Sequence, residues 1–223
     1  MQLDNETQNL IVSAKLGNDE ALNRLFARYQ SRILRIVRLR LSSELRYKLK
    51  LQSMDIVQEV FMYALRHLKE FEPKSQGHFL NWMGKKVEHY ICDRLDYISA
   101  NKREAPGGEI SIEQEVNPGA DTEKKYIQID NDGTTPSQFA VKQEREQLID
   151  SLLNLLDQEQ KELIIHRDLE EMTFAEIGEL LGKTEDAIRK QYCRAFKKLV
   201  DLSADKLKPI IAEESYRKYK NEF

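Results

Sequence analysis

A chain of 223 residues is long enough for two helical domains with modest cores, and its 40% hydrophobic and 33% charged content is typical of soluble globular proteins. Only 9 Gly and 5 Pro residues favour a mostly helical chain with few turns. The first residues, MQLDNETQNL, lack a basic segment followed by an apolar run, and no apolar run of the sequence is long enough to cross a bilayer. We therefore expect a cytoplasmic protein without a signal peptide or membrane insertion.

The net charge of −3 conceals a strong segregation of charge along the chain. Residues 24–50 contain nine Lys or Arg and one acid, and residues 183–198 contain six Lys or Arg and two acids. Residues 104–146 contain ten acids and four bases. Two basic surfaces separated by an acidic tether predict binding to a polyanion. Solvated helix faces would give the same pattern over 24–50, so that segment alone leaves both interpretations open.

Residues 5–103 have the pattern of consecutive helices. Asn18 is placed to cap a helix that runs to about Leu41, and the acids Asp19 and Glu20 suit the positive end of its dipole. Apolar residues recur in this helix every three or four positions, as on the buried face of an amphipathic helix. They are Leu22, Leu25, Phe26, Tyr29, Ile33, Ile36 and Val37.

Two more helices follow in the same block. Ser53 is placed to cap the first of them. Pro73 and Gly77 then interrupt the helical pattern, which predicts a loop over 71–78. A third long helix comes next, and its apolar positions are spaced by four. They are Phe79, Met83, Val87, Ile91 and Leu95.

The periodicity fails over residues 104–134, which hold two Pro, four Gly and scattered acids, a linker composition. Helical pattern resumes at Thr135, a candidate cap, followed by Pro136 in the first turn, where its missing N–H costs nothing. Asp157 is placed to open a further short helix.

The stretch TFAEIGELLGKTEDAIRKQYCRAFKKL begins at Thr173 and holds two helical patterns separated by three residues that include Gly182. Thr173 and Glu176 form an S/T-x-x-E capping box, and Thr184 is placed to cap the second helix. Two short helices joined in this way predict a helix-turn-helix, whose second helix enters the DNA major groove. The residues expected to face inward from the first helix are Ile177, Leu180 and Leu181.

The second helix of this motif is basic. Arg189 and Lys190 lie near its start, where side chains reach base edges, and further cations along the helix suit phosphates. Gly178 has no side chain, which lets the second helix pack closely across the first. A helical hairpin with a merely solvated basic face is the alternative, but the capping box, the Gly break and the basic helix together favour DNA binding.

The sequence thus predicts an all-α protein with two helical domains joined by a flexible acidic linker. The domains are a helical domain over 1–103, the linker over 104–134, a helix-turn-helix domain over 135–202 and a tail over 203–223 with no assigned role.

The helix that begins near Ser53 has an acidic polar edge of Asp55, Gln58 and Glu59. Beside apolar residues, such an edge suits a basic protein groove rather than phosphates. Acids that favour the positive end of the helix dipole explain the same pattern, so this helix alone leaves both interpretations open.

Three stretches of the sequence resemble one family. SMDIVQEVFMYALRHLKEFE looks like the core-polymerase-binding helix of bacterial sigma factors, and HFLNWMGKKVEHYICDRL resembles the promoter-melting helix that follows it. Residues 155–199 are similar to the −35-binding domain. Together with LNRLFARYQSRILRIV, the resemblance covers about three quarters of the chain in the right order, and it points to the extracytoplasmic-function (ECF) branch of the sigma-70 family. Gly178 departs from the family, which often has Ala there.

The resemblance implies promoter-directed transcription initiation, with roles for the matching residues. Asp55, Gln58 and Glu59 would contact the clamp helices of the largest subunit of core RNA polymerase. Single-stranded −10 DNA would be captured by Lys74, Ser75, His78, Asn81, Trp82, Lys85, Lys86 and Arg94. The −35 duplex would be contacted by Lys183, Thr184, Arg189, Lys190, Arg194, Lys197 and Lys198. An anti-sigma factor is left open as a partner, and the basic segment 38–50 has no assigned role.

Other function classes explain less of the sequence. A stand-alone helix-turn-helix regulator is the alternative function, but it leaves the acidic-edged helix unexplained, and an anti-sigma-like scaffold leaves the basic helix unexplained. An enzyme is not expected, because Asp55 and Glu59 have metal-pair spacing but the four His are scattered and no Gly-rich phosphate loop is present. Cys92 and Cys193 are expected to pack as reduced hydrophobes. No catalytic residue, metal, cofactor or small-molecule substrate is predicted.

Overall fold

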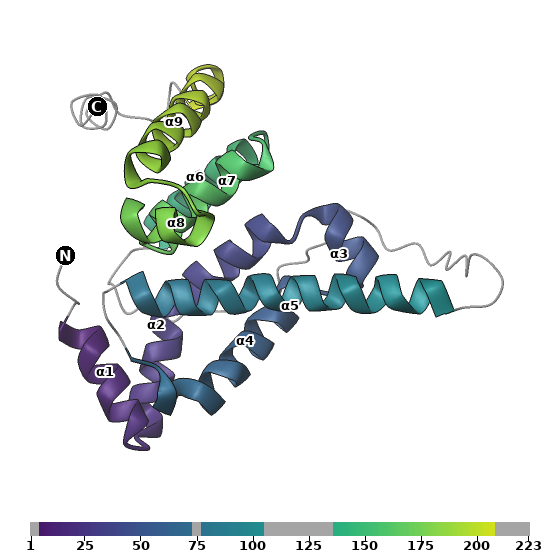
Figure 1. Ribbon diagram of the computed structural model, residues 1–223. Coiled ribbons are helices and arrows are strands. Elements are labelled where there is room, and N and C mark those ends of the chain that lie inside the picture. Colours follow the sequence, from purple (N-terminus) through teal and green to yellow (C-terminus); the bar gives the residue numbers. More distant parts are fainter. Residues whose placement is uncertain (1–4, 73–76, 105–135, 208–223) are drawn as a thin grey trace. The chain divides into compact units, whose positions relative to one another are not determined.

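A computed structural model describes residues 5–72, 77–104 and 136–207, and every regular element in these ranges is a helix (Figure 1). The helices form two compact units, one made of α1 to α5 and the other of α6 to α9. The predicted all-α fold is thereby confirmed. The predicted linker lies outside the described residues from 105 onward, and the predicted domain boundaries stay predictions. Within the described ranges, no helix combines the length and apolarity that a membrane crossing needs.

The first unit is built around its second helix. Its elements are α1 (Asn5–Lys15), α2 (Asp19–Arg40), α3 (Ser43–Leu49), α4 (Ser53–His67), the short 3-10 turn η1 (Leu68–Glu70) and α5 (Gly77–Glu104). α2 packs against α1, α4 and α5 (Figure 1). Leu25, Ile33 and Ile36 of α2, Val60 of α4 and Met83 of α5 are all fully buried. Each such side chain contributes about 1.5–3 kcal/mol by leaving water.

The start of α2 shows why this amphipathic helix begins where it does. Asn18 accepts a hydrogen bond from the Ala21 N–H through its Oδ1 at 3.0 Å. The acids Asp19 and Glu20 occupy the first turn, where the helix dipole favours negative charge. The helix ends at Arg40, with Leu41 at the C-cap. The predicted cap and the predicted extent of this helix are both confirmed.

The start of α4 differs from the prediction. Gln52 occupies the N-cap, and its N–H donates to Asp55 Oδ2 at 2.9 Å. Ser53 is the first residue of the helix and is buried, and its Oγ has no hydrogen-bond partner among the described residues. The predicted Ser53 cap is therefore wrong by one position. The reason is that an acid in the third helical position reaches back to the residue three before it, here Gln52.

The second unit is organised around its last helix. Its elements are α6 (Pro136–Leu153), α7 (Gln158–Ile164), the π-helical turn η2 (Ile165–Leu169), α8 (Phe174–Leu181) and α9 (Glu185–Leu207). α9 packs against α6, α7 and α8. Leu152 of α6, Leu163 of α7, Ile177 of α8, and Ile188 and Ala195 of α9 are buried. α9 continues past residue 202 to Leu207, so the predicted tail begins as helix.

Side-chain caps define the helix boundaries of this unit. Asp157 accepts from the Gln160 N–H at 2.9 Å and opens α7. The Thr173 N–H donates to Glu176 Oε2 at 2.7 Å, and the Glu176 N–H donates to Thr173 Oγ1 at 3.2 Å. Thr184 accepts from the Ala187 N–H at 3.3 Å at the start of α9. Each of these caps confirms the sequence prediction, because a cap depends only on residues a few positions apart.

Two glycines shape the turn between α8 and α9. Gly182 adopts a left-handed φ of +64°, which reverses the chain at the end of α8 at little cost without a Cβ. A Cβ on Gly178 would lie 2.6 Å from the carbonyl oxygen of Lys183, which is backbone and has little freedom to move away. Gly178 therefore permits a close approach of the turn to α8, whereas the sequence predicts that the second helix itself packs closely there.

The apolar face of α8 is less buried than the pattern predicts. Ile177 is fully buried, but Leu180 and Leu181 are each 41% exposed. The prediction that all three face inward is wrong for the two leucines. Both leucines fall in the last turn of this eight-residue helix, directly before its C-cap Gly182.

Candidate nucleic-acid and polymerase interfaces

The predicted −35 residues lie together on α9 and the turn before it. Thr184 is exposed and caps the helix, and Lys183 is half-buried. The remaining cations are exposed along α9 and are Arg189, Lys190, Arg194, Lys197 and Lys198. The second helix of the motif thus presents its positive charge to solvent, as a recognition helix must.

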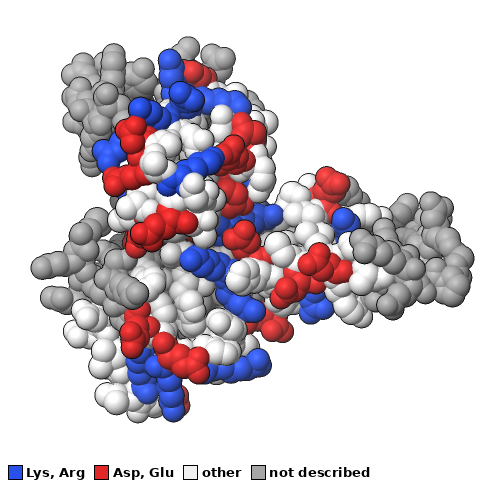
Figure 2. Space-filling model, in the orientation of Figure 1, with Lys and Arg blue, Asp and Glu red and all other residues white. Residues whose placement is uncertain are grey.

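The first two cations of α9 are paired with acids of the same helix. Arg189 Nη2 donates to Glu185 Oε1 at 2.7 Å, and Lys190 Nζ lies 2.7 Å from Asp186 Oδ2. The hydrogen bond and the positive charge of Lys190 lower the pKa of Asp186. Basic and acidic side chains are also interleaved on the visible surface of this unit (Figure 2). The net positive charge of the helix is therefore partly balanced by its own first turn.

The remaining cations of α9 and of the turn before it divide into two groups. Lys183 pairs with Glu159 and donates to Gln191 Oε1 at 3.3 Å. Lys198 lies 3.4 Å from Asp157. These two lysines tie the recognition helix and its turn to α7. Arg194 and Lys197, within the described ranges, have no ion pair.

Phe174, the first residue of α8, lies beside two of the cations. The Arg167 guanidinium is 4.6 Å from the ring centroid and that of Arg189 is 5.4 Å from it. The Tyr192 ring packs against the same phenyl group at 5.4 Å, and the Tyr192 hydroxyl donates to Asp168 at 3.0 Å. The sequence predictions missed both Phe174 and Arg167. The only available signal was an aromatic residue directly after a capping threonine.

The predicted polymerase-binding residues share one edge of α4. Asp55, Gln58 and Glu59 are all exposed. Asp55 also accepts the hydrogen bond from Gln52 at the helix start, so its carboxylate contributes to the fold as well. Met62, which was not predicted, is 45% exposed and lies one turn beyond on the same face. The edge is therefore acidic at its start and apolar after it.

Trp82, a predicted −10 residue, is part of an aromatic cluster at the start of α5. Its ring stacks on Phe71 at 4.7 Å with an interplanar angle of 25°. It also lies 5.7 Å from Tyr63 and 5.9 Å from Phe79. His78 is half-buried and contacts Phe71 at 5.5 Å. These ring contacts hold the end of α4 and the start of α5 together.

The cations of α5 have different environments. Lys86 Nζ lies 4.6 Å from the centroid of the Tyr63 ring. Arg94 Nη2 donates to the Tyr90 hydroxyl at 3.0 Å, and this hydrogen bond raises the pKa of Arg94. Lys85 is exposed and lies nine residues before Arg94, which at about 100° per residue places the two on opposite sides of the helix. The structure therefore does not bring all the predicted cations onto one face.

The other predicted −10 residues cannot all be compared with the structure. Asn81 is only 8% exposed, and its Oδ1 has no hydrogen-bond partner among the described residues. Lys74 and Ser75 lie outside the described residues.

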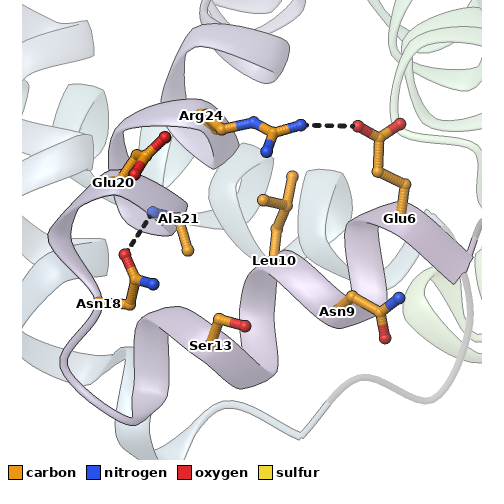
Figure 3. A pocket seen from close by; sticks show the side chains of 8 residues that line it. All are labelled: Glu6, Asn9, Leu10, Ser13, Asn18, Glu20, Ala21 and Arg24. Atoms are coloured by element: carbon orange, nitrogen blue, oxygen red, sulfur yellow. Dashed lines mark hydrogen bonds and ion pairs between the residues drawn. The ribbon is translucent and has the colours of Figure 1, made fainter.

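Other kinds of site that the described ranges could hold are a metal site, a reactive thiol and a pocket. These ranges contain no group of three or more His, Cys, Asp or Glu arranged to hold a metal ion. Cys92 is exposed and Cys193 is half-buried, and both are free thiols. A pocket of about 290 Å³ lies between α1 and α2 (Figure 3). Glu6 and Arg24 form an ion pair at 3.3 Å at its rim, and none of its lining residues belongs to the predicted interfaces.

Comparison with known proteins gives matches to one family. Residues 146–199 match the family described as sigma-70, region 4. The chain is 24% identical over 188 residues to the ECF RNA polymerase sigma-E factor of Haemophilus influenzae, which is 84% of this chain and 90% of that protein. It is 23% identical over 204 residues to the ECF RNA polymerase sigma-E factor of Escherichia coli K12, which is 92% of this chain and 95% of that protein. A solved structure of CnrH in complex with the cytosolic domain of CnrY is 19% identical to this chain, with a TM-score of 0.49, and covers 90% of this chain and 99% of that one.

The region 4 match spans the capped helix-turn-helix and its exposed basic helix, the features by which region 4 of sigma-70 factors would contact DNA. The match and the relatives together support a sigma factor of that family. The two relatives cover more than four fifths of the chain, and both are named ECF factors, which supports the ECF branch of the family. Sigma factors are regulatory DNA-recognition proteins rather than enzymes.

Proposed function

We propose that this chain acts in the cytoplasm as a dissociable subunit of RNA polymerase that selects promoters and directs transcription initiation. The observation that carries the proposal is the match to region 4 over a helix-turn-helix whose second helix exposes Arg189, Lys190 and Arg194. Relatives named as RNA polymerase sigma factors, covering both units, support the same function. Core polymerase and promoter DNA are the partners that such a factor requires.

The polymerase contact is proposed to be the exposed edge of α4. Asp55, Gln58 and Glu59 would face the clamp helices of the largest subunit, and their acidity suits a basic partner surface. A substitution of Asp55 can also disturb folding, because its carboxylate accepts a hydrogen bond from the Gln52 N–H at the start of α4. Asp55→Asn keeps an oxygen that can accept from Gln52 but removes the charge, whereas Asp55→Ala removes both.

We expect Asp55→Asn combined with Glu59→Gln to weaken binding to purified core polymerase at least about tenfold, because hydrogen bonds to charged groups contribute about 1.5–3 kcal/mol. Far-UV circular dichroism should stay unchanged. Glu88→Gln, which removes an exposed acid of α5, is the matched control and should bind as the wild type does. Equal affinity of the double variant and the control would reject the α4 edge as the contact.

The −35 contact is proposed to divide between base reading and phosphate binding. Arg189 and Lys190 would read bases, and Arg194, Lys197 and Lys198 would contact phosphates. Arg189→Ala should cost about 1–3 kcal/mol and relax the preference at one −35 position. Lys197→Ala should weaken all promoters equally and reduce the slope of log affinity against log salt by about one. If both variants weaken every sequence equally, Arg189 is not a base reader.

The −10 contact is proposed to involve Trp82, Lys86 and Arg94 with opened single-stranded DNA, where rings and cations suit bases and phosphates. The remaining predicted residues, including Lys74 and Ser75, stay predictions for this role.

One experiment separates a sigma factor from a stand-alone regulator. The protein, core polymerase and genomic DNA fragments are mixed, and transcript starts and permanganate-reactive thymines are mapped. A sigma factor gives specific starts with melted thymines just upstream only when both proteins are present, because core polymerase fixes the spacing at which −35 and −10 contacts reinforce each other. Tight, specific duplex binding by the protein alone, with no gain in initiation on adding core, would identify a regulator.

A further inference from the structure

We propose that Phe174 and Glu185 are positioning residues that hold the Arg189 guanidinium ready to read a guanine of the −35 element. Under this proposal, specificity depends on a side chain of the first helix of the motif as well as on the recognition helix. The inference rests on the proposed function, since it requires Arg189 to be a base reader.

Two contacts from different elements restrain Arg189. Glu185 Oε1 accepts from its Nη2 at 2.7 Å, and the guanidinium carbon lies 5.4 Å from the centre of the Phe174 ring. The Arg189 side chain is nevertheless 56% exposed, so the guanidinium stays accessible from solvent. An arginine has five N–H donors in a rigid fork. The pair with Glu185 uses one nitrogen, which leaves donors for O6 and N7 of a guanine.

The Phe174 ring is itself well anchored. Tyr192 packs against it, and the Tyr192 hydroxyl is fixed by Asp168. Arg167 lies closer to the ring than Arg189 does, and Arg167 Nη1 donates to the Met172 carbonyl oxygen at 2.8 Å. A ring held in this way limits the rotamers that Arg189 can adopt. Restraint before binding lowers the entropy lost on binding, which is about 0.5–1.5 kcal/mol for a flexible side chain.

The neighbouring ion pair provides a natural comparison. Lys190 and Asp186 lie in the same turn at the same 2.7 Å separation. The ring contacts of the described residues include Arg189 but not Lys190. A lysine ammonium is also a point charge without a planar fork to orient. Removing either acid lessens repulsion of phosphates by one charge, but only the loss of Glu185 should disturb a planar base contact.

The test uses holoenzyme and a DNA library with random sequence in the −35 element, sorted by binding and sequenced. Discrimination is the affinity ratio between the preferred base and the others at each position. Arg189→Ala should lower discrimination at one position by roughly 5- to 150-fold. Phe174→Leu and Glu185→Gln should lower it at the same position by about 2- to 12-fold. Phe174→Tyr keeps the ring and should keep the discrimination.

Asp186→Asn is the matched control for Glu185→Gln, and each should raise affinity for all sequences by a similar factor. Only Glu185→Gln should lower discrimination. In the Arg189→Ala background, Phe174→Leu should cause no further loss, because its effect acts through the arginine. Thermal unfolding of each variant separates these effects from loss of folded protein, and Phe174→Tyr is the folded control if Phe174→Leu unfolds.

The outcomes distinguish a failure of the proposed base reader from a failure of the positioning role alone. Unchanged discrimination in Arg189→Ala would reject the proposed base reader itself. Lost discrimination in Arg189→Ala, with full discrimination in Phe174→Leu and Glu185→Gln, would overturn only the positioning role. Equal losses in Asp186→Asn and Glu185→Gln would also overturn it, because charge rather than orientation would then be responsible.

Discussion

The two candidate DNA-binding helices, α9 and α5, present their functional side chains in different ways. On α9 the cations project from the surface, and the partners of Arg189 and Lys190 are acids of the same helix. On α5 the equivalent groups take part in packing, since Trp82 stacks on Phe71 and Lys86 lies over Tyr63. The difference predicts that changes to the cations of α9 affect binding with little cost in stability, whereas changes to Trp82 or Lys86 of α5 affect both.

The two helices are proposed to bind different forms of DNA, α9 a duplex and α5 an opened single strand. A duplex keeps its bases stacked, so a preformed row of exposed cations can bind it without rearrangement. A single strand offers unstacked bases that need an aromatic surface. One face of Trp82 is already covered by Phe71. A base that stacks on Trp82 must use the opposite face or displace Phe71.

The largest expected effect compares Trp82 with Arg194. Trp82→Ala removes ring contacts with Phe71, Tyr63 and Phe79. We expect a loss of about 2 kcal/mol in the free energy of unfolding, less than for a fully buried aromatic side chain. Arg194→Ala, which removes an exposed side chain, should change it by less than about 0.5 kcal/mol. Denaturant unfolding followed by circular dichroism measures both. Equal values would remove the distinction between the two helices.

Gly178→Ala tests whether the position of α9 depends on its close approach to α8. The new Cβ would lie 2.6 Å from the Lys183 carbonyl oxygen, and overpacking of this kind costs about 1–3 kcal/mol. Ala gains about 1 kcal/mol over Gly inside a helix. We expect a net loss of about 1 kcal/mol in unfolding free energy, with weaker −35 binding as the turn moves. A stabilised variant with normal binding would show that the turn accommodates the methyl group.

A smaller effect separates the adjacent lysines of α5. Lys86→Ala removes a cation from the Tyr63 ring and should reduce the free energy of unfolding by about 0.5–1 kcal/mol. Lys85→Ala removes an exposed lysine without a ring contact and should leave it unchanged. Both variants lose one charge, so both should lower the salt dependence of DNA binding. If Lys86→Ala is no more destabilising than Lys85→Ala, the cation–π contact contributes nothing to the fold.

The smallest expected effect is a titration on α9. Because Lys190 lowers the pKa of Asp186, the pair adds to stability above the ordinary pKa of an aspartate. That contribution is lost as the pH falls through the lowered value in the folded state. NMR titration should show an Asp186 pKa below the ordinary range, and Lys190→Met should return it toward that range. An unchanged pKa in this variant would show that the exposed pair is not formed in solution.

Local signals in the sequence determined where most helices begin and which helix is basic. Asn18, Asp157, Thr173 and Thr184 are read correctly because a capping side chain and the backbone N–H that donates to it lie within a few residues. Helical periodicity likewise predicts the buried face of α2, since a buried stripe repeats with the helix turn. The resemblance to sigma factors follows from the same local motifs, in the order that the family has them.

Only the tertiary structure decided how far each face is covered and which side chains from different elements meet. Periodicity places Leu180 and Leu181 inward, but α9 leaves them exposed. The contact of Phe174 with Arg189 joins residues fifteen positions apart across the turn, and the contact of Tyr63 with Lys86 joins two separate helices. Periodicity describes one helix at a time, whereas such contacts depend on the angle and distance at which two helices pack.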